Sequence, residues 1–592
     1  MFGGGAMKSA VPMHRLDRSP NYDAVPRVEA GSPSECAVGW QEICSQIRGT
    51  GARVVLVETY TGVADKDIAL LLNGLGPDVS VDTTDAFKHP EEIEEMVEPD
   101  VTSDRVFGCL TRLHLRDFLS PARFQELRSR VDRAAGTVVV HGPGASLIVG
   151  GDLLIYAGMP RWEGQLRQRM NEAANLGLEN HGERPSTKYK RGFFVDWRVL
   201  DRHRRTIWDR IDFVLDTTDH LVPKMISSAS LYRALQSTAR RPFRVVPYFD
   251  PAPWGGHWIE KVCGIETDKP NLGWCFDCVP EENSLLLGFG SRSFEVPSVD
   301  LVFREPRMLL GESVYGRFGA EFPIRFDFLD TMEGGNLSMQ VHPLTEYIQQ
   351  NFGMNYTQDE SYYLLDAGEG ASVYLGLKND AEPDAMIADL RRAEEGDYRF
   401  PDERYINRFP AKKHDHFLIP AGTVHCSGAN SMVLEISATP YIFTFKLWDW
   451  DRLGLDGKPR PLHIGHGERS IQWHRKTEYA RTRLINRVRR ESEGEGWTEE
   501  STGLHEAEFI ETRRHWFTRT VPHETNGLNV LNLVEGDEAV VESPDGAFDP
   551  FVVHYAETFI VPSAAGPYTI RPHGPAEGSQ CATIKAFVRT KG

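Results

Sequence analysis

The chain has little cysteine, no long apolar run and a deficit of positive charge. Its 592 residues include eight cysteines, too few and too scattered for the disulfide framework of a small secreted domain. No stretch of the sequence approaches the roughly 18 uninterrupted apolar residues that a membrane helix needs. With 85 acidic against 66 basic side chains and a net charge of −19, the composition also argues against a general binder of nucleic acid or anionic membranes.

We therefore expect a soluble, cytoplasmic chain. Its first residues lack the apolar core of a signal peptide. With 40% hydrophobic and 26% charged residues, a chain of this length can bury more than one core, and three or four domains are expected. One Cys-x-x-Cys pair occurs at Cys275 and Cys278, but a structural zinc site needs a second pair, and none follows at a suitable spacing.

The pattern of residues changes along the chain. Up to about residue 240, β-branched runs such as 54–57 alternate with Arg- and Glu-rich helical segments, which predicts a parallel α/β sheet. Beyond it, short strands are separated by Gly, Pro, Asn and Asp turns, as in β-sandwiches or small barrels. The predicted organisation is a disordered arm over 1–30, an α/β domain over 31–240, a β domain over 241–470 with a helical insertion near 381–396, a charged linker over 471–504 and a last β domain over 505–592.

The residues that suggest chemistry lie between 330 and 460. Alternation places Gln340 and His342 on the same face of one strand. Glu360 follows 18 residues after His342, where an acid enters an apolar strand, and His425 follows a Pro-x-Gly turn further on. Two imidazoles, one carboxylate and one amide oxygen suit zinc or another divalent metal, one ion per chain. The alternative ligands nearby are His414, His416, His463 and His466.

The order of these residues resembles the metal site of cupins, and most closely that of class I mannose-6-phosphate isomerases. The family's L-S-x-Q-x-H-P strand matches 337–343, its metal-binding glutamate matches Glu360, and its P-A-G-x-x-H turn matches 420–425. An L-E-I strand follows at 434–436. The resemblance spans about 245–465, implies a cupin fold there, and suggests a second, metal-free cupin at the C-terminus.

The resemblance implies a metal-dependent aldose–ketose isomerase that converts mannose-6-phosphate or a related sugar through an enediol. Such chemistry needs a Lewis acid, a base that moves a proton between adjacent carbons, and a cation for the developing charge. The four residues above would be the metal ligands, and Glu435 would assist proton transfer. Lys446 would be the reacting cation, at a position where the family has arginine. Arg452 and Arg460 are expected to contact the substrate.

Two further departures from the family remove positive charge from the predicted pocket. Asp327, also expected at the substrate, stands where the family has an active-site lysine, and Gln358 replaces a second lysine. Lys446 keeps its charge but lacks the planar fork of arginine. The electrostatics therefore favour a less anionic ligand, such as an unphosphorylated sugar, or a phosphate held by another domain.

The N-terminal α/β domain resembles uridine-kinase-like P-loop kinases in layout but lacks their phosphate loop. Where G-x-x-x-x-G-K-[ST] is needed, the chain has Asp65, Lys66 and Asp67, and acids there would repel phosphate. We expect a degenerate, catalytically silent domain. Residues 187–206 hold seven Lys or Arg against two acids, which fits either a solvated amphipathic helix or a lid that binds an anion.

Two other functions fit the same residues. A non-catalytic, metal-containing cupin coupled to the kinase-like domain would sense sugar without converting it. A metal-dependent cupin oxygenase is less favoured, because Gln340 stands where many oxygenases have a second histidine. In each case the expected partner is a small sugar or sugar phosphate, with no nucleic acid and no membrane, and the oligomeric state stays open.

Overall fold

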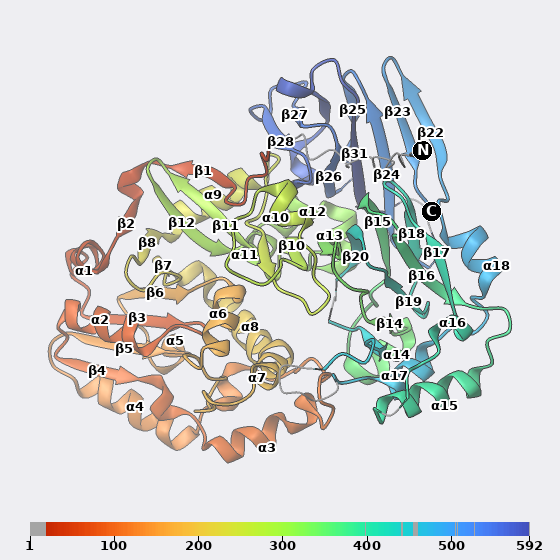
Figure 1. Cartoon of the computed structure of the whole chain (residues 1–592). Helices are drawn as coiled ribbons and strands as arrows, with labels where there is room; N and C mark the ends of the chain where they lie inside the picture. Colours follow the sequence, from red (N-terminus) through yellow and green to blue (C-terminus); the bar gives the residue numbers. More distant parts are fainter. Residues whose placement is uncertain are drawn as a thin grey trace, which may run out of the picture.

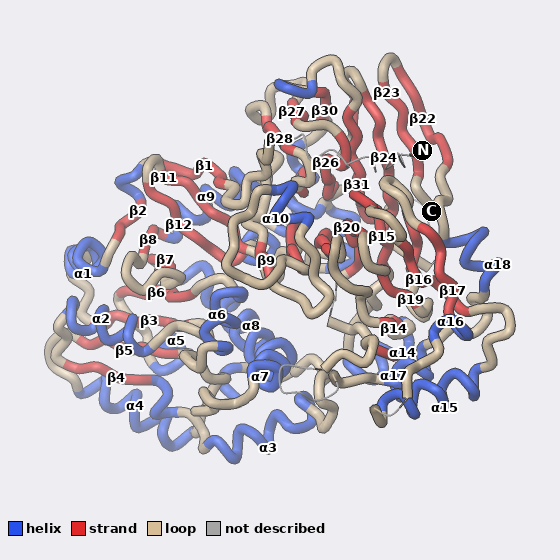
Figure 2. Tube along the Cα trace, viewed as in Figure 1, coloured by secondary structure: helices blue, strands red, loops and turns tan. Residues whose placement is uncertain are grey.

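The computed structural model describes residues 19–396, 398–439, 442–453, 460–503, 505, 507–525 and 527–590 (Figure 1). Six sheets are found among them, and most of the long helices belong to the first part of the chain (Figure 2). The described residues contain no helix with the length and apolar composition that crossing a membrane requires. Residues 1–18 of the predicted disordered arm lie outside the described residues.

The N-terminal part is built on one seven-stranded sheet. Five neighbouring strands run parallel, and two antiparallel strands complete one edge. Every residue of β3 (Val54–Thr59) is buried, as the apolar run 54–57 predicts for its first four residues. Across the sheet the strands are β2 (Cys36–Val38), β8 (Lys224–Ser227), β7 (Phe213–Asp216), β6 (Leu153–Gly158), β3 (Val54–Thr59), β5 (Val138–Gly142) and β4 (Val79–Asp82).

Helices cover both faces of this sheet. Val55 and Val57 of β3 pack with two of them on one face, and Val54 and Leu56 point into the larger core on the other. The predicted alternation of buried strands and helices is thus confirmed. The helices are α1 (Trp40–Gly49), α2 (Asp65–Leu75), α3 (Pro90–Val101), α4 (Pro121–Arg133), α5 (Ala145–Ile148), α6 (Arg161–Arg169), α7 (Pro185–Arg191), α8 (Trp197–Ile207) and α9 (Ser228–Thr238).

The end of the predicted disordered arm is a strand. β1 (Arg27–Gly31) pairs in parallel with β11 (Ser284–Phe289), which pairs with β12 (Arg292–Pro297). The prediction of disorder for 19–30 was wrong, because the partner of this short strand lies more than 250 residues away and local composition does not report it.

The central part contains two antiparallel sheets that share a core. One sheet orders β18 (His416–Ile419), β15 (Glu360–Ala367), β20 (Ser431–Ala438), β13 (Ile324–Asp330), β10 (Trp274–Cys278) and β9 (Tyr248–Asp250). The other orders β17 (Ile406–Pro410), β16 (Ser372–Leu377), β19 (His425–Ser427), β14 (Met339–Val341) and β21 (Phe445–Trp448). The predicted helical insertion is confirmed as α15 (Pro383–Glu394). The other helices are α10 (Trp258–Cys263), α11 (Val299–Arg304), α12 (Pro306–Leu310), α13 (Glu312–Phe318), α14 (Thr345–Phe352), α16 (Asp402–Tyr405), α17 (Ile464–Ser470) and α18 (Thr477–Tyr479).

The C-terminal part is a second pair of antiparallel sheets around its own core. One sheet orders β22 (Arg489–Gly494), β23 (Trp497–Ser501), β24 (Ile510–Phe517), β31 (Cys581–Val588), β26 (Asn529–Glu535) and β29 (Thr558–Val561). The other orders β25 (Val521–His523), β30 (Tyr568–Pro572), β27 (Glu538–Glu542) and β28 (Phe551–His554). The predicted linker over 471–504 therefore contains two strands. They lie at a sheet edge with little apolar burial. Their sequence is therefore charged and lacks the apolar alternation from which a strand is predicted.

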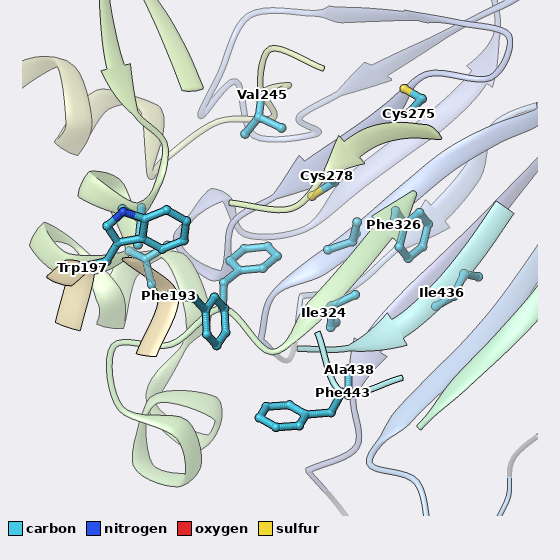
Figure 3. Packing of buried hydrophobic residues seen from close by; sticks show 14 of the residues in the cluster. Phe193, Trp197, Val245, Cys275, Cys278, Ile324, Phe326, Ile436, Ala438 and Phe443 are labelled. Atoms are coloured by element: carbon cyan, nitrogen blue, oxygen red, sulfur yellow. The ribbon is translucent and has the colours of Figure 1, made fainter. Parts of the chain in front are cut away.

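The N-terminal and central parts pack through a continuous hydrophobic core. Phe194, in the π-helical turn 192–196 before α8, lies 6.0 Å from Phe443, between ring centroids. Figure 3 shows Phe193 and Trp197 on the N-terminal side and Ile324 and Phe443 on the central side.

The basic segment 187–206 is not a solvated helix. Lys188, Lys190 and Arg191 are 0–5% exposed, and their charges are satisfied inside the protein. Arg191 pairs with Asp196 at 3.2 Å, and the ammonium groups of Lys188 and Lys190 donate to backbone carbonyls. The prediction of a solvated helix was wrong for these residues because tertiary packing buries them, although Arg205 of α8 is exposed. The alternative of a lid that binds an anion stays a prediction.

Candidate metal centre

The two sheets of the central part bring the predicted ligands together. Gln340 on β14 lies opposite His425 on β19 in the ladder of one sheet, and His342 follows β14 directly. Glu360 is the first residue of β15 in the facing sheet. Opposed residues of an antiparallel pair point to the same side, so these side chains meet between the sheets.

A tight turn fixes the position of His425. Gly422 has φ +85°, and a Cβ there would meet the Ser470 carbonyl oxygen at 2.8 Å, so only glycine fits. The Gly422 amide donates to the His342 carbonyl at 3.0 Å. Asp359 accepts a hydrogen bond from the Ala421 amide at 2.7 Å. The Pro-Ala-Gly turn is thus tied to the residues that flank two other ligands.

Within the described residues, His342, Glu360 and His425 form a buried group whose candidate ligand atoms all lie within 4.8 Å of one another. His342 Nε2 lies 3.0 Å from Glu360 Oε2, and His425 Nε2 lies 2.8 Å from Glu360 Oε1. The other ring nitrogens, Nδ1, donate to the carbonyls of Phe443 at 3.0 Å and Thr423 at 2.8 Å. Backbone acceptors at Nδ1 select the tautomer whose Nε2 carries a lone pair.

This arrangement fits a metal cation. Two Nε2 lone pairs aimed at one carboxylate repel it unless a proton or a cation lies between them. Burial by itself raises the pKa of Glu360, but the two imidazoles, each with a proton on Nε2, would hold that pKa well below its ordinary value. The Gln340 side-chain amide lies 3.2 Å from His425 Nε2, and rotating the amide would present its oxygen as a fourth ligand.

A buried ionic network adjoins the group. Arg325 pairs with Asp327 at 2.9 Å and with Glu435 on the neighbouring strand. The Gln358 amide donates to Glu360 at 3.0 Å and to Glu435 at 3.4 Å, and so links the network to the metal ligands. Burial raises the pKa of Asp327 to about 7 and that of Glu435 well above its usual range, despite the guanidinium between them.

Lys446 lies in the same row of the sheet as two predicted ligands. It is opposite Gln340, which is opposite His425, so all three side chains point to one face. Among the described residues its ammonium has no hydrogen bond or ion pair, and Asp327 pairs with Arg325 instead. Burial, reinforced by the nearby Arg460, lowers the pKa of Lys446 to about 8.

Arg452 and Arg460 lie close to Lys446. Both bond the same buried carboxylate, Asp449, at 2.6 Å, which orients the two guanidinium groups. The structure therefore groups three predicted cations at one end of β21. Asp327 is not part of that cluster and lies within the buried Arg325 network.

The other proposed ligands do not join the metal group. His414, His416, His463 and His466 are absent from it among the described residues. Cys275 and Cys278 are 0–1% exposed within the hydrophobic core, and burial raises the pKa of both thiols well above their ordinary value. This disfavours the thiolate form that binds metal.

Sequence reasoning missed three residues of this region. Arg325 and Asp327 are two residues apart on one strand and share a face, a signal that alternation could have revealed. Gln358 was read only as a lost lysine. Glu508, from the segment before β24, lines a small cavity of about 10 Å³ together with Asp359 and Glu360, and no sequence signal places it there.

Comparison with known proteins separates two parts of the chain. A family described as a domain of unknown function (DUF8485) matches residues 39–240. A mannose-6-phosphate isomerase of Streptococcus mutans is 29% identical over 215 residues, 36% of this chain and 61% of that protein. One from Bacillus subtilis is 26% identical over 219 residues, 37% of this chain and 64% of that protein.

The chain also aligns with a solved structure. The mannose 6-phosphate isomerase of Bacillus subtilis aligns with 59% of this chain and 100% of its own, at 20% identity and a TM-score of 0.48. The chain spans less than two thirds of the length of the curated relatives that it matches. Over a third of its length, the chain is thus similar in sequence to mannose-6-phosphate isomerases, and residues 39–240 match a separate family.

Proposed function

We propose that the central part is a metal-dependent aldose–ketose isomerase of the mannose-6-phosphate isomerase class, acting through an enediol on mannose-6-phosphate or a related sugar. The observation that carries this proposal is the buried His342–Glu360–His425 group, with both Nδ1 atoms bonded to backbone carbonyls. The curated relatives, named mannose-6-phosphate isomerases, support the same reaction class.

Gln340, His342, Glu360 and His425 would hold the ion, zinc or another divalent metal. When bound, such an ion supplies a Lewis acid that polarises the sugar's carbonyl and hydroxyl oxygens. The chain's own residues supply the remainder of the chemistry: they orient the sugar, move the proton and balance charge.

Glu435 is the proposed proton carrier. Burial raises the pKa of Glu435 above the usual range of a carboxyl group, which favours the uptake of a proton. It would take the proton from C2 of the open-chain aldose and return it to C1, while a second proton passes from the C2 hydroxyl to the C1 oxygen. Gln358 donates to Glu435 and Glu360, and so holds the carrier beside the ligands.

The cations missing by comparison with the family are partly replaced. Arg325 brings a guanidinium into the region where the family has a lysine. Lys446, in the row of Gln340, has an ammonium that no described residue pairs with. We infer that Lys446 stabilises the charge of the enediol and that Arg452 and Arg460 orient the sugar. Asp327 would act at the substrate only through Arg325.

The first test combines metal analysis with a coupled assay on mannose-6-phosphate, fructose-6-phosphate and free mannose. We expect one equivalent of zinc or another divalent metal, and turnover of at least one sugar. His342→Ala should lose metal and turnover together. His257→Ala, which changes a histidine whose side chain is 39% exposed, should keep both. Full metal stoichiometry in His342→Ala would refute the ligand assignment.

A second test addresses Lys446. Removing one preorganised charge at a reacting centre typically costs about 10²–10³ in kcat, so Lys446→Met should fall by that order with metal content unchanged. Lys446→Arg, which restores the family residue, should retain most activity. Equal activity in Lys446→Met and the wild type would remove Lys446 from the mechanism.

We further infer that the N-terminal part is a kinase-like domain without nucleotide chemistry. Asp67, at the start of α2, is fully buried, accepts from His220 at 2.8 Å and lies 3.6 Å from Arg167. Lys66 points to Glu172, at 3.7 Å. Asp67 is thus engaged in buried pairs and Lys66 in a surface pair with an acid, so titration with Mg-ATP should give no saturable heat.

A further inference from the structure

A row of aromatic rings lies on the outward face of the central part, where polar residues are expected. Trp274 and Phe276 of β10 are half-buried and point outward, while Cys275 and Asp277 between them are 0–1% exposed and point into the core. An antiparallel sheet with one solvated face normally carries polar residues there. Consecutive outward aromatics therefore call for a partner that covers them.

The row continues across the sheet and onto the N-terminal part. Phe276 is opposite Tyr248 on β9, with ring centroids 6.0 Å apart and planes within 22°. Trp274 lies 5.7 Å from Phe276 at 5°, and Trp162 of α6 lies 5.9 Å from Tyr248 at 22°. Each of the four rings is thus within 22° of the plane of the next, and all four are partly exposed, so together they form one continuous aromatic surface.

A cavity of about 370 Å³ opens beside these rings, between α6 and α7 on one side and β9 and β10 on the other. This volume lies in the usual range for small-molecule sites, which favour the boundary between structural units. Tyr189, Tyr248 and Phe276 contribute apolar lining. Gln165, Gln168, Arg169 and Glu282 contribute polar groups.

One polar side chain of the lining makes no hydrogen bond to the described residues. Gln168 is 4% exposed, and among the described residues its side-chain amide makes no hydrogen bond. Buried amides are nearly always paired, and the amide of Gln168 borders the cavity. The amide offers an NH₂ donor and a carbonyl acceptor, and a sugar hydroxyl can accept from the first and donate to the second.

The charges of the lining disfavour a phosphate. Arg169 is already bound to both oxygens of Asp250, at 3.1 and 3.0 Å. Glu282 accepts from Gln165 at 2.5 Å. No unpaired cation is left among the described lining residues, so an anionic ligand would meet a carboxylate without compensation.

We propose that this cavity and the adjoining aromatic row bind a neutral saccharide, at a site separate from the metal centre. Aromatic faces pack against the apolar C–H face of a sugar ring, and planar amides and carboxylates bond its hydroxyl groups. The row of rings favours a short chain of sugar units over a single one. This proposal does not depend on isomerase activity.

The test uses sugars that the metal centre cannot convert. Methyl glycosides of mannose, glucose and N-acetylglucosamine, and the corresponding β-1,4-linked methyl trisaccharides, cannot open at the reducing end. Saturation-transfer NMR and calorimetric titration of the full chain should show saturable binding of at least one trisaccharide. Binding should persist in His342→Ala, which keeps this site distinguishable from the proposed isomerase.

Two substitutions map the site. Phe276→Ala and Gln168→Ala should each weaken trisaccharide binding about tenfold or more, while Phe551→Ala, which changes a half-buried ring of the C-terminal part, should not. Circular dichroism checks that each variant folds. Absence of binding across the panel, or unchanged affinity in Phe276→Ala, overturns the proposal. Tighter binding of adenosine or uridine at these residues would also overturn it, in favour of a nucleoside site.

Discussion

The guanidinium of Arg325 pairs with two buried carboxyl groups at once, those of Asp327 and Glu435. Breaking a buried pair by removing one partner costs about 3–5 kcal/mol, because the charge left behind is uncompensated. Arg325→Gln should lower stability by that order in thermal unfolding. The matched control is Arg408→Gln, on the rim of the same sandwich, with a small effect. Adding Glu435→Gln to Arg325→Gln should recover part of the loss, and no recovery would contradict the pairing.

Glu295 on β12 provides a test of pH dependence. Burial, and then the neighbouring Asp216, raise its pKa to about 7, above its value of about 4.3 in unfolded chains. A carboxyl with a raised folded pKa costs stability above that pKa, and the cost disappears as pH falls toward the unfolded value. Glu295→Gln should therefore stabilise the protein by on the order of 2 kcal/mol at pH 8 and little at pH 4.5. A gain that is the same at both values would disprove this assignment, and the exposed Glu266→Gln should show no such trend.

The buried group of His342, Glu360 and His425 was predictable residue by residue, because a pattern with fixed order leaves few alternatives and strand alternation determines which side chains share a face. Arg325 was not recognised, although the same alternation applies to it. The resemblance to the family drew attention to Asp327, which stands where the family has a lysine. Arg325, two residues earlier, has no such counterpart. Glu508 and Gln358 depend on contacts between segments far apart in the chain, which a local pattern does not contain.

At the scale of elements, a loop of the N-terminal part, residues 102–111, packs against β21, the strand that carries Lys446. Phe107 is fully buried, with its ring 5.7 Å from Phe443, 5.1 Å from Phe445 and 4.8 Å from His463. Asp104 in the same loop pairs with His466 at 3.1 Å. The loop therefore fills one side of β21 and limits how far Lys446 can move.

Removing that ring should loosen β21. Phe107→Ala should cost about 3–5 kcal/mol and increase amide exchange both in the loop 102–111 and in β21. Phe124→Ala, in the core beneath α4, should raise exchange around α4 and leave β21 protected. Unchanged exchange in β21 of Phe107→Ala would show that the loop does not restrain the strand.

Helices and strands with a strong local pattern were easier to predict than those that depend on distant partners. β3, β5 and β6 were expected from β-branched runs, and α15 from its helical spacing, because each has a strong local pattern. β1 and β22 were missed because both are short or charged edge strands whose pairing partners supply the order. Likewise, the segment 187–206, which includes the π-helical turn and α8, was interpreted as a solvated basic helix. Its sequence shows seven basic residues but not the carboxylates and backbone carbonyls that they contact.

At the scale of the whole molecule, one hydrophobic cluster runs through the N-terminal and central parts and touches the C-terminal part. Buried ion pairs cross the first junction, such as that of Arg204 with Asp300 at 2.5 Å. A boundary near residue 240 was predicted from the change in pattern. Composition could not reveal that the two parts share a core, because that depends on which faces meet in three dimensions.

A shared core predicts that the two parts unfold together. A ligand that binds only the folded state stabilises whatever unfolds with its site, by about 2.7 kcal/mol at a hundredfold excess over Kd. Zinc bound at the central site should therefore raise the calorimetric transition temperature and also slow amide exchange in α8. His342→Ala should abolish both effects. If α8 exchanges at the same rate with and without zinc while the central strands become protected, the N-terminal part unfolds independently, and the contacts across the junction are too weak to couple it to the metal centre.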